Sequence, residues 1–169
     1  MHSRIFEVQD TYFPVDEWAS ESLISNENYE VDGADYFAVV YDENERVEDI
    51  ENFFTNYFPL ASFKVIENKP GQTAIVEFVG NIDEIYAKWY ECVKDAFSAL
   101  DESMGAMTAF RVRNALEEPF ELATKFYMED WTGYTAPACE FLDWLKHLSK
   151  QNNGEPFKLY VGQVFDYHF

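Results

Sequence analysis

A large excess of acidic side chains is the feature that most limits what this chain can become. Its 169 residues include 32 Asp and Glu but only 12 Lys and Arg, which gives a formal net charge of −20 at pH 7. High net charge usually accompanies disorder, yet 47% of the residues are hydrophobic and the chain contains 16 Phe, 11 Tyr and 4 Trp. The composition therefore predicts a folded, strongly anionic protein.

The charge also argues against some classes of function. A protein that binds nucleic acid without sequence preference uses Lys and Arg to neutralise phosphates, and electrostatic anchoring to anionic lipids needs basic clusters. We therefore expect neither direct nucleic-acid binding nor a membrane partner. The first residues lack the apolar segment of a signal peptide, and no apolar run approaches the ~18 residues of a membrane-spanning helix. A cytoplasmic location is expected.

Hydrophobic periodicity predicts a mixture of helices and strands. Helices are expected at residues 16–25, 44–57, 82–100 and 136–150. Strands are expected at residues 4–9, 35–41, 62–67, 73–79, 107–113 and 157–165, with 35–41 as a central strand.

Two local signals strengthen these assignments. Pro70 and Gly71 favour a tight turn that joins the two strands around them into a hairpin. Asn81 and Glu84 have the spacing of a capping box at the start of the helix at 82–100. Because the elements do not alternate as strand and helix, we predict one α+β domain over residues 1–169, with a mainly antiparallel sheet and three to four helices.

Residues suited to catalysis or metal binding are few. Glu140, Asp143 and His147 share a face of the predicted helix at 136–150, but that face is also its ordinary polar side. Cys92 and Cys139 lack metal-ligand spacing and are expected as reduced thiols in the core. No phosphate-binding, nucleophile-elbow, zinc-protease or kinase motif occurs. We therefore expect no enzymatic activity, no catalytic residue, no metal and no cofactor.

The acidic excess is concentrated near the start of the chain. Residues 1–51 contain fifteen acids and two bases, so they carry −13 of the net charge of −20. Like charges gathered on one surface repel each other, which suggests a field directed at a basic partner. The polar side of the helix at 44–57, opposite its apolar stripe, and a second acidic row before it form the expected partner-binding face: Asp16, Glu17, Glu21, Asp42, Glu43, Glu45, Glu48 and Asp49.

This face supports the hypothesis of an acidic protein-binding module. In its most specific form, the carboxylates imitate phosphates and occupy the basic nucleic-acid channel of another protein. Exposed aromatic residues would anchor such a contact, and the candidates are Tyr12, Trp18, Tyr29, Tyr36 and Tyr41. Two alternatives remain open. One is an interaction or scaffold domain whose acidic surface only maintains solubility, and the less favoured one is a hydrolase with a carboxylate and His site.

The two ends of the chain carry a family resemblance. Ser3-Arg4-Ile5-Phe6 and the last ten residues, Tyr160-Val161-Gly162-Gln163-Val164-Phe165-Asp166-Tyr167-His168-Phe169, resemble the terminal segments of small acidic uncharacterised proteins carried by bacterial mobile elements. The resemblance implies a bacterial cytoplasm and the company of antirestriction and anti-CRISPR proteins, several families of which act as anionic decoys. Fold and function are not carried over from this resemblance, and it is the acidic face that predicts the partner, a basic protein such as a nucleic-acid-processing enzyme.

Overall fold

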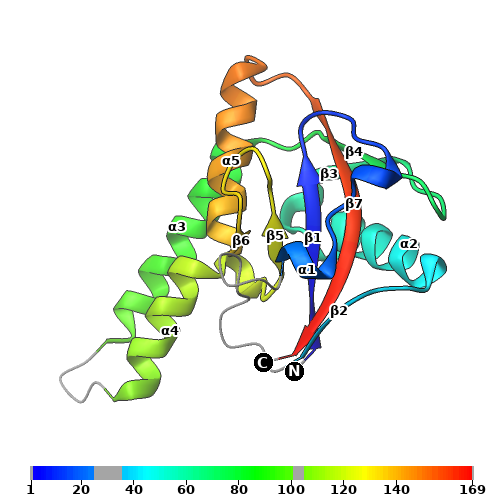
Figure 1. The fold of residues 1–169 in the computed structure, drawn as a ribbon. Coiled ribbons are helices and arrows are strands. Elements are labelled where there is room, and N and C mark those ends of the chain that lie inside the picture. The colour runs from blue at the N-terminus through cyan, green and yellow to red at the C-terminus, as the bar shows by residue number, and fades with distance from the viewer. Residues whose placement is uncertain (1, 25–35, 101–104, 169) are drawn as a thin grey trace.

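A seven-stranded, mostly antiparallel sheet organises the molecule (Figure 1). The computed structural model describes residues 2–24, 36–100 and 105–168. The sheet has the order β3-β4-β7-β1-β5-β6, and β2 also pairs with β7. Every pair is antiparallel except β1 with β5. The strand bounds are β1 His2–Gln9, β2 Tyr36–Val39, β3 Phe63–Glu67, β4 Ala74–Phe78, β5 Lys125–Tyr127, β6 Thr135–Ala136 and β7 Phe157–His168.

The long strand β7 is the centre of this sheet. Its 12 residues pair with β1 along one edge, while β4 and β2 share the other edge at its two ends. The α+β class and the predicted hairpin of β3 and β4 are confirmed. Among the described strands, β2 pairs with β7 alone, so the prediction that it is central was wrong. Of its two aromatic residues, Phe37 stacks on Phe165, whereas Tyr36 is exposed.

Five α-helices surround the sheet in the described ranges, slightly more than the three to four expected. Their bounds are α1 Glu21–Ile24, α2 Glu43–Asn52, α3 Ile82–Ser98, α4 Ala106–Glu117 and α5 Ala138–Gln151. Asn81 caps α3 as predicted, because its side chain accepts a hydrogen bond from the amide of Asp83 at 3.0 Å and donates one to Glu84. The first half of the predicted helix at 16–25 is a 3₁₀ turn, Val15–Glu17, followed by α1, and the residue after Ile24 lies outside the described ranges.

Two predictions about helices need correction. Residues 107–113 form part of α4 and not a strand. The helix predicted at 44–57 ends as an α-helix at Asn52 and continues as a π-helical turn, Phe53–Tyr57. This wider turn buries Phe53 and Phe54 but rotates Tyr57 outward, leaving it 69% exposed although the helical period had placed it on the apolar side.

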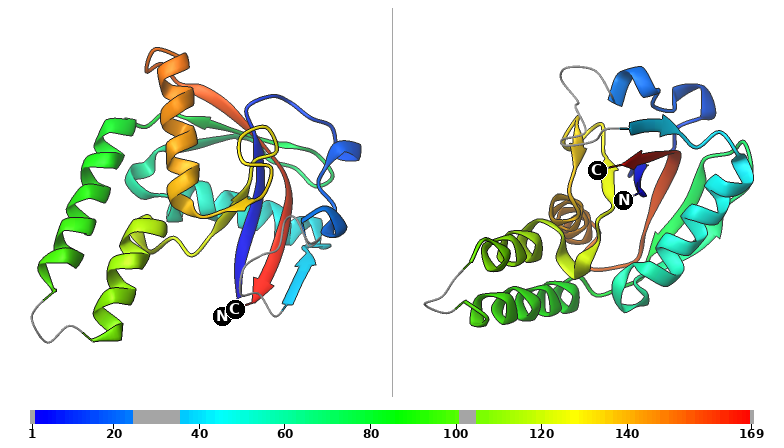
Figure 2. Two further views of the ribbon diagram at one scale, coloured as in Figure 1. Left: turned by 60° about the vertical axis from the view of Figure 1, so that its left-hand side comes forward. Right: turned by 90° about the horizontal axis from the view of Figure 1, so that it is seen from below.

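Apolar side chains pack on both faces of the sheet. The larger cluster joins the π-helical turn and α5 to one face, and within it the rings of Phe126 and Phe141 stack 3.9 Å apart. A smaller cluster on Ile5, Phe165 and Tyr167 is covered by Ile24 of α1. Figure 2 shows α1 and α5 on opposite sides of the strands. No helix in the described ranges has the length and apolarity needed to cross a membrane.

A β-bulge interrupts the pairing of β1 with β7. The register shifts between Phe6 and Val8, so Gly162 and Gln163 of β7 both face Glu7 of β1. The backbone here lies very close to its neighbours, since a Cβ on Gly162 would come within 2.5 Å of the Glu7 carboxylate and 2.6 Å of the Phe13 ring. Glycine at this position therefore allows the bulge to pack.

Gly162→Ala is expected to destabilise the protein. The added methyl group must displace the buried Glu7 carboxylate or the Phe13 ring, and overpacking of this kind costs about 1–3 kcal/mol of unfolding free energy. The measurement is chemical denaturation of both proteins. Gly105→Ala is the control, because a Cβ there meets nothing within 4 Å, and equal stability of the Gly162 variant and the natural chain would contradict this account.

Candidate functional site

Five of the eight predicted acidic residues lie on α2 or at its start. Asp42 is the N-cap, and its carboxylate accepts a hydrogen bond from the amide of Asn44 at 2.9 Å. The positive end of a helix stabilises anions nearby, which offsets part of the repulsion within this group. Glu48 is exposed and forms no ion pair within the described part of the chain.

Two of these acids hold an arginine from β1. The guanidinium of Arg4 lies 2.8 Å from the carboxylate of Glu45 and 2.6 Å from that of Asp49. It also pairs with Asp166 on β7. One cation therefore serves three carboxylates, so this half of the acidic face is only partly neutralised.

Arg46, which was not among the residues predicted from the sequence, has a completely buried side chain. Its guanidinium donates to the backbone carbonyls of Gly162, Lys69 and Gln72 at 3.0, 3.1 and 2.8 Å, and to the carboxylate of Glu43 at 2.9 Å. The cation is thus paired and hydrogen-bonded, which is what makes a buried charge tolerable. The sequence contained one indication of this burial. Arg46 precedes Ile50 by four residues, and this spacing places both on the apolar side of α2.

Trp18 closes the other side of this buried cation. The Arg46 guanidinium carbon lies 4.6 Å from the centre of the Trp18 ring, a cation–π contact. The indole N–H donates to the hydroxyl of Thr73 at 2.9 Å, and that hydroxyl donates to the carbonyl of Phe13 at 2.6 Å. These contacts fasten the segment around the 3₁₀ turn, which carries Asp16 and Glu17, against α2.

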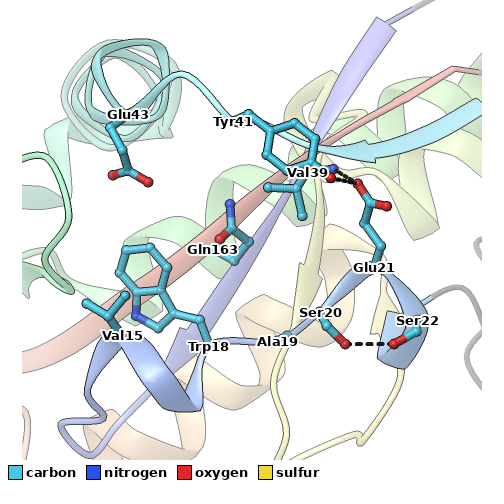
Figure 3. Close-up of a pocket in the computed structure, with 10 residues that line it drawn as sticks. All are labelled: Val15, Trp18, Ala19, Ser20, Glu21, Ser22, Val39, Tyr41, Glu43 and Gln163. Carbon is cyan, nitrogen blue, oxygen red and sulfur yellow. Dashed lines mark hydrogen bonds between the residues drawn. The ribbon is translucent and has the colours of Figure 1, made fainter.

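An open depression lies where these elements meet (Figure 3). It has a volume of about 600 Å³ and brings together Glu21 of α1 and Glu43 of α2, which belong to the two separate acidic rows of the prediction. Glu21 accepts hydrogen bonds from the amide of Val39 at 2.7 Å and the hydroxyl of Tyr41 at 3.1 Å. The remaining lining residues are Val15, Trp18, Ala19, Ser20, Ser22 and Gln163.

The predicted aromatic anchors do not all gather here. Trp18 and Tyr41 line the depression, and Tyr41 is 78% exposed. Tyr12 instead contacts Tyr160, and Tyr36 contacts His2. Tyr29 lies outside the described ranges. The depression can therefore present two aromatic rings beside carboxylates, an arrangement suited to a cationic side chain.

A second buried charge borders the bulge of β7. Glu7 is 1% exposed, and its two carboxylate oxygens accept hydrogen bonds from the amides of Ala19 and Gln163, each at 2.9 Å. Burial raises the pKa of Glu7 to about 7, although the two amide hydrogen bonds oppose this rise. No sequence pattern indicated this residue, because an acid in a short strand is ordinarily outward-facing, whereas β1 buries four consecutive residues, Ile5 to Val8.

The residues considered for catalysis do not converge. Glu140 accepts a hydrogen bond from Tyr134, Asp143 accepts one from Tyr86, and His147 contacts Gln151. Within the described ranges, no group of three His, Cys, Asp or Glu side chains is arranged to hold a metal ion. Cys92 is exposed on α3, so its prediction as a core residue was wrong, whereas Cys139 is half-buried.

Comparison with known proteins adds no relative. No family model, curated protein or solved structure matches the chain. The resemblance of the chain ends to mobile-element proteins stays a prediction. The function is therefore inferred from the acidic face and the depression beside it.

Arg46→Met is expected to destabilise the protein strongly. The substitution leaves three buried or half-buried carbonyls without their donor and Glu43 without its cation, and breaking such a site costs about 3–5 kcal/mol. Thermal and chemical unfolding measure the loss. Lys88→Met is the matched control, since Lys88 forms only an exposed pair with Glu91 and its loss should change stability little. Similar stability of the two variants would count against the role given to Arg46.

Stability is also expected to fall as pH rises from about 4.5 to about 7. The pKa of Glu7 is about 7 in the folded protein against an ordinary value of 4.5, so the folded state favours the protonated acid. This contribution is fully present below about pH 4.5 and is lost as pH rises through about 7, for a total near 3 kcal/mol.

Glu7→Gln tests this dependence. The variant lacks the Glu7 carboxylate, while every other titrating group is present in both proteins. The difference in unfolding free energy between the two proteins should change between about pH 4.5 and about pH 7 and level off above that, with the natural chain losing relative stability as pH rises. Parallel curves would show that Glu7 does not titrate in this range.

Proposed function

We propose that the protein is a non-catalytic binding module whose acidic surface occupies a basic surface of another protein. The observation that carries this proposal is the exposure of Asp16, Glu17, Asp42 and Glu48 on the two elements that border the depression, without an ion pair among the described residues. The ion pairs formed by the other acids of the face go to Arg4 and Arg46, the two bases of residues 1–51. The outward charge therefore stays strongly negative.

The chain itself illustrates how such a face would bind. Arg4 lies between the carboxylates of Glu45 and Asp49, at 2.8 and 2.6 Å, so acids one turn apart on α2 hold a guanidinium between them. A partner that presents Lys or Arg side chains would meet comparable carboxylate pairs, with the exposed ring of Tyr41 available for a cation–π contact.

Nucleic-acid-binding enzymes are the partner class that this chemistry favours. Their channels hold rows of Lys and Arg that neutralise phosphates, and a face of closely spaced carboxylates competes for the same cations. The resemblance of the chain ends to mobile-element proteins points in the same direction, towards a decoy of the antirestriction or anti-CRISPR type in a bacterial cytoplasm.

The triple variant Asp16→Asn, Glu17→Gln, Glu48→Gln tests the proposal. The natural chain, immobilised, is exposed to a bacterial extract, and retained proteins are eluted by salt or by duplex DNA and identified by mass spectrometry. We expect a basic nucleic-acid-binding protein that DNA displaces and that binds more weakly as salt shortens the screening length from about 10 Å to about 3 Å. Retention should fall for the triple variant, because three exposed charges of the face are removed.

A control variant separates this face from net charge. The variant Asp95→Asn, Asp130→Asn, Glu155→Gln also removes three negative charges, but from exposed positions outside the acidic face. It should retain the partner as the natural chain does. Equal losses in both variants, or none in either, would contradict a specific acidic face.

A further inference from the structure

A helical hairpin extends from the body of the molecule. Figures 1 and 2 show α3 and α4 side by side, reaching away from the sheet on the side opposite α2. Only Ile82 and Ile85 of α3 are buried, and no described residue of α4 is. Large apolar side chains are nevertheless exposed along the hairpin, namely Tyr90, Phe97, Met107, Phe110 and Leu116.

One face of this hairpin is hollowed into a groove of about 690 Å³. Small side chains of α3, Cys92, Ala96 and Ala99, line one side. The other side carries Met107 and Phe110 of α4, which are 67% and 54% exposed. A hollow beside small residues and large apolar side chains that project from its edge therefore occur on the same surface, as a self-complementary contact requires.

The polar residues of the groove are also self-complementary. Arg111 lies in the first half of α4, and Glu118 follows its end, both in the groove lining and both without an ion pair among the described residues. Suppose that two copies of α4 pack antiparallel about a two-fold axis near Asn114. A residue that precedes Asn114 in one copy then lies opposite the residue that follows Asn114 by a similar number of positions in the other copy. Arg111 of each copy then faces Glu118 of the other, which forms two equivalent charge pairs.

We propose that the occupant of this groove is a second copy of the chain, packed on it with two-fold symmetry. In this register Phe110 of each copy packs against the segment that follows α4 in the other copy, where Phe120 also lines the groove, and the Arg111–Glu118 pairs fix the register. Residues 82–118 contain eight acids and four bases, a charge density close to the average of the chain, so the Arg111–Glu118 pairs have to offset repulsion between the copies.

The size of the hairpin limits the area that this dimer can bury. At 1.5 Å per residue, the 17 residues of α3 span about 25 Å and the 12 residues of α4 about 18 Å. Small interfaces are typical of weak or transient complexes, so association is expected at concentrations of about 1 μM and above. The inference does not depend on the proposed binding of a basic partner, because α2 lies on the other side of the molecule.

Sedimentation velocity of the purified full chain tests the proposal. Between about 1 and about 200 μM the natural chain should shift from monomer towards dimer. Phe110→Asp should weaken dimerisation about tenfold or more, since it places a charge in the apolar contact. Leu116→Asp is the matched control, because Leu116 is an exposed residue of the same helix that does not line the groove, and it should dimerise as the natural chain does.

Charge exchange tests the register independently of apolar contacts. Arg111→Glu and Glu118→Arg should each weaken the dimer, and the variant that carries both should recover it, since the pairs are then rebuilt with reversed sign. A chain that stays monomeric over the whole concentration range would overturn the proposal. So would a dimer that Phe110→Asp leaves intact, or one that the combined charge variant fails to restore.

Discussion

The guanidinium of Arg46 joins three parts of the molecule that are distant in sequence. From α2 it reaches the turn between β3 and β4 through Lys69 and Gln72, and the bulge of β7 through Gly162. The bulge leaves a carbonyl and an amide without strand partners, and Arg46 binds the carbonyl of Gly162 while Glu7 binds the amide of Gln163. Because β7 pairs with β1, β2 and β4, these two buried charges stabilise the register of the whole sheet.

The same contacts shape the outer surface. Residues 1–51 contain only two bases. The fold buries Arg46 completely and packs Arg4 of β1 against carboxylates of α2 and β7. The cation that stabilises the β7 bulge is thus withdrawn from the surface, on which Asp16, Glu17, Asp42 and Glu48 stay exposed. Burial of Arg46 therefore both organises the core and leaves the surface around α2 negatively charged.

What could be predicted from the sequence was local. Pro70-Gly71 and the Asn81 cap depend on neighbouring residues, and both the hairpin and the start of α3 were found. The error at residues 107–113 has a physical cause, since no described residue of α4 is buried and the helix leaves no 3.6-residue apolar pattern to read.

The candidate site could be predicted only in part for a related reason. The acidic residues of α2 followed from its helical period, but the partners of Arg46 lie as far as 116 residues away, and no local pattern encodes them. The meeting of Glu21 and Glu43 at one depression likewise depends on how α1 and α2 pack.

The acidic excess also bears on which contacts the exposed apolar hairpin can make. Two molecules of charge −20 repel each other in most orientations, and at physiological salt this repulsion acts over about 8 Å. Non-specific association through Met107 or Phe110 is opposed by it, because random orientations bring acidic surfaces together without compensation. Only an approach that pairs cations with carboxylates at short range offsets the repulsion. The charge of the chain therefore acts against wrong partners as much as it attracts a right one.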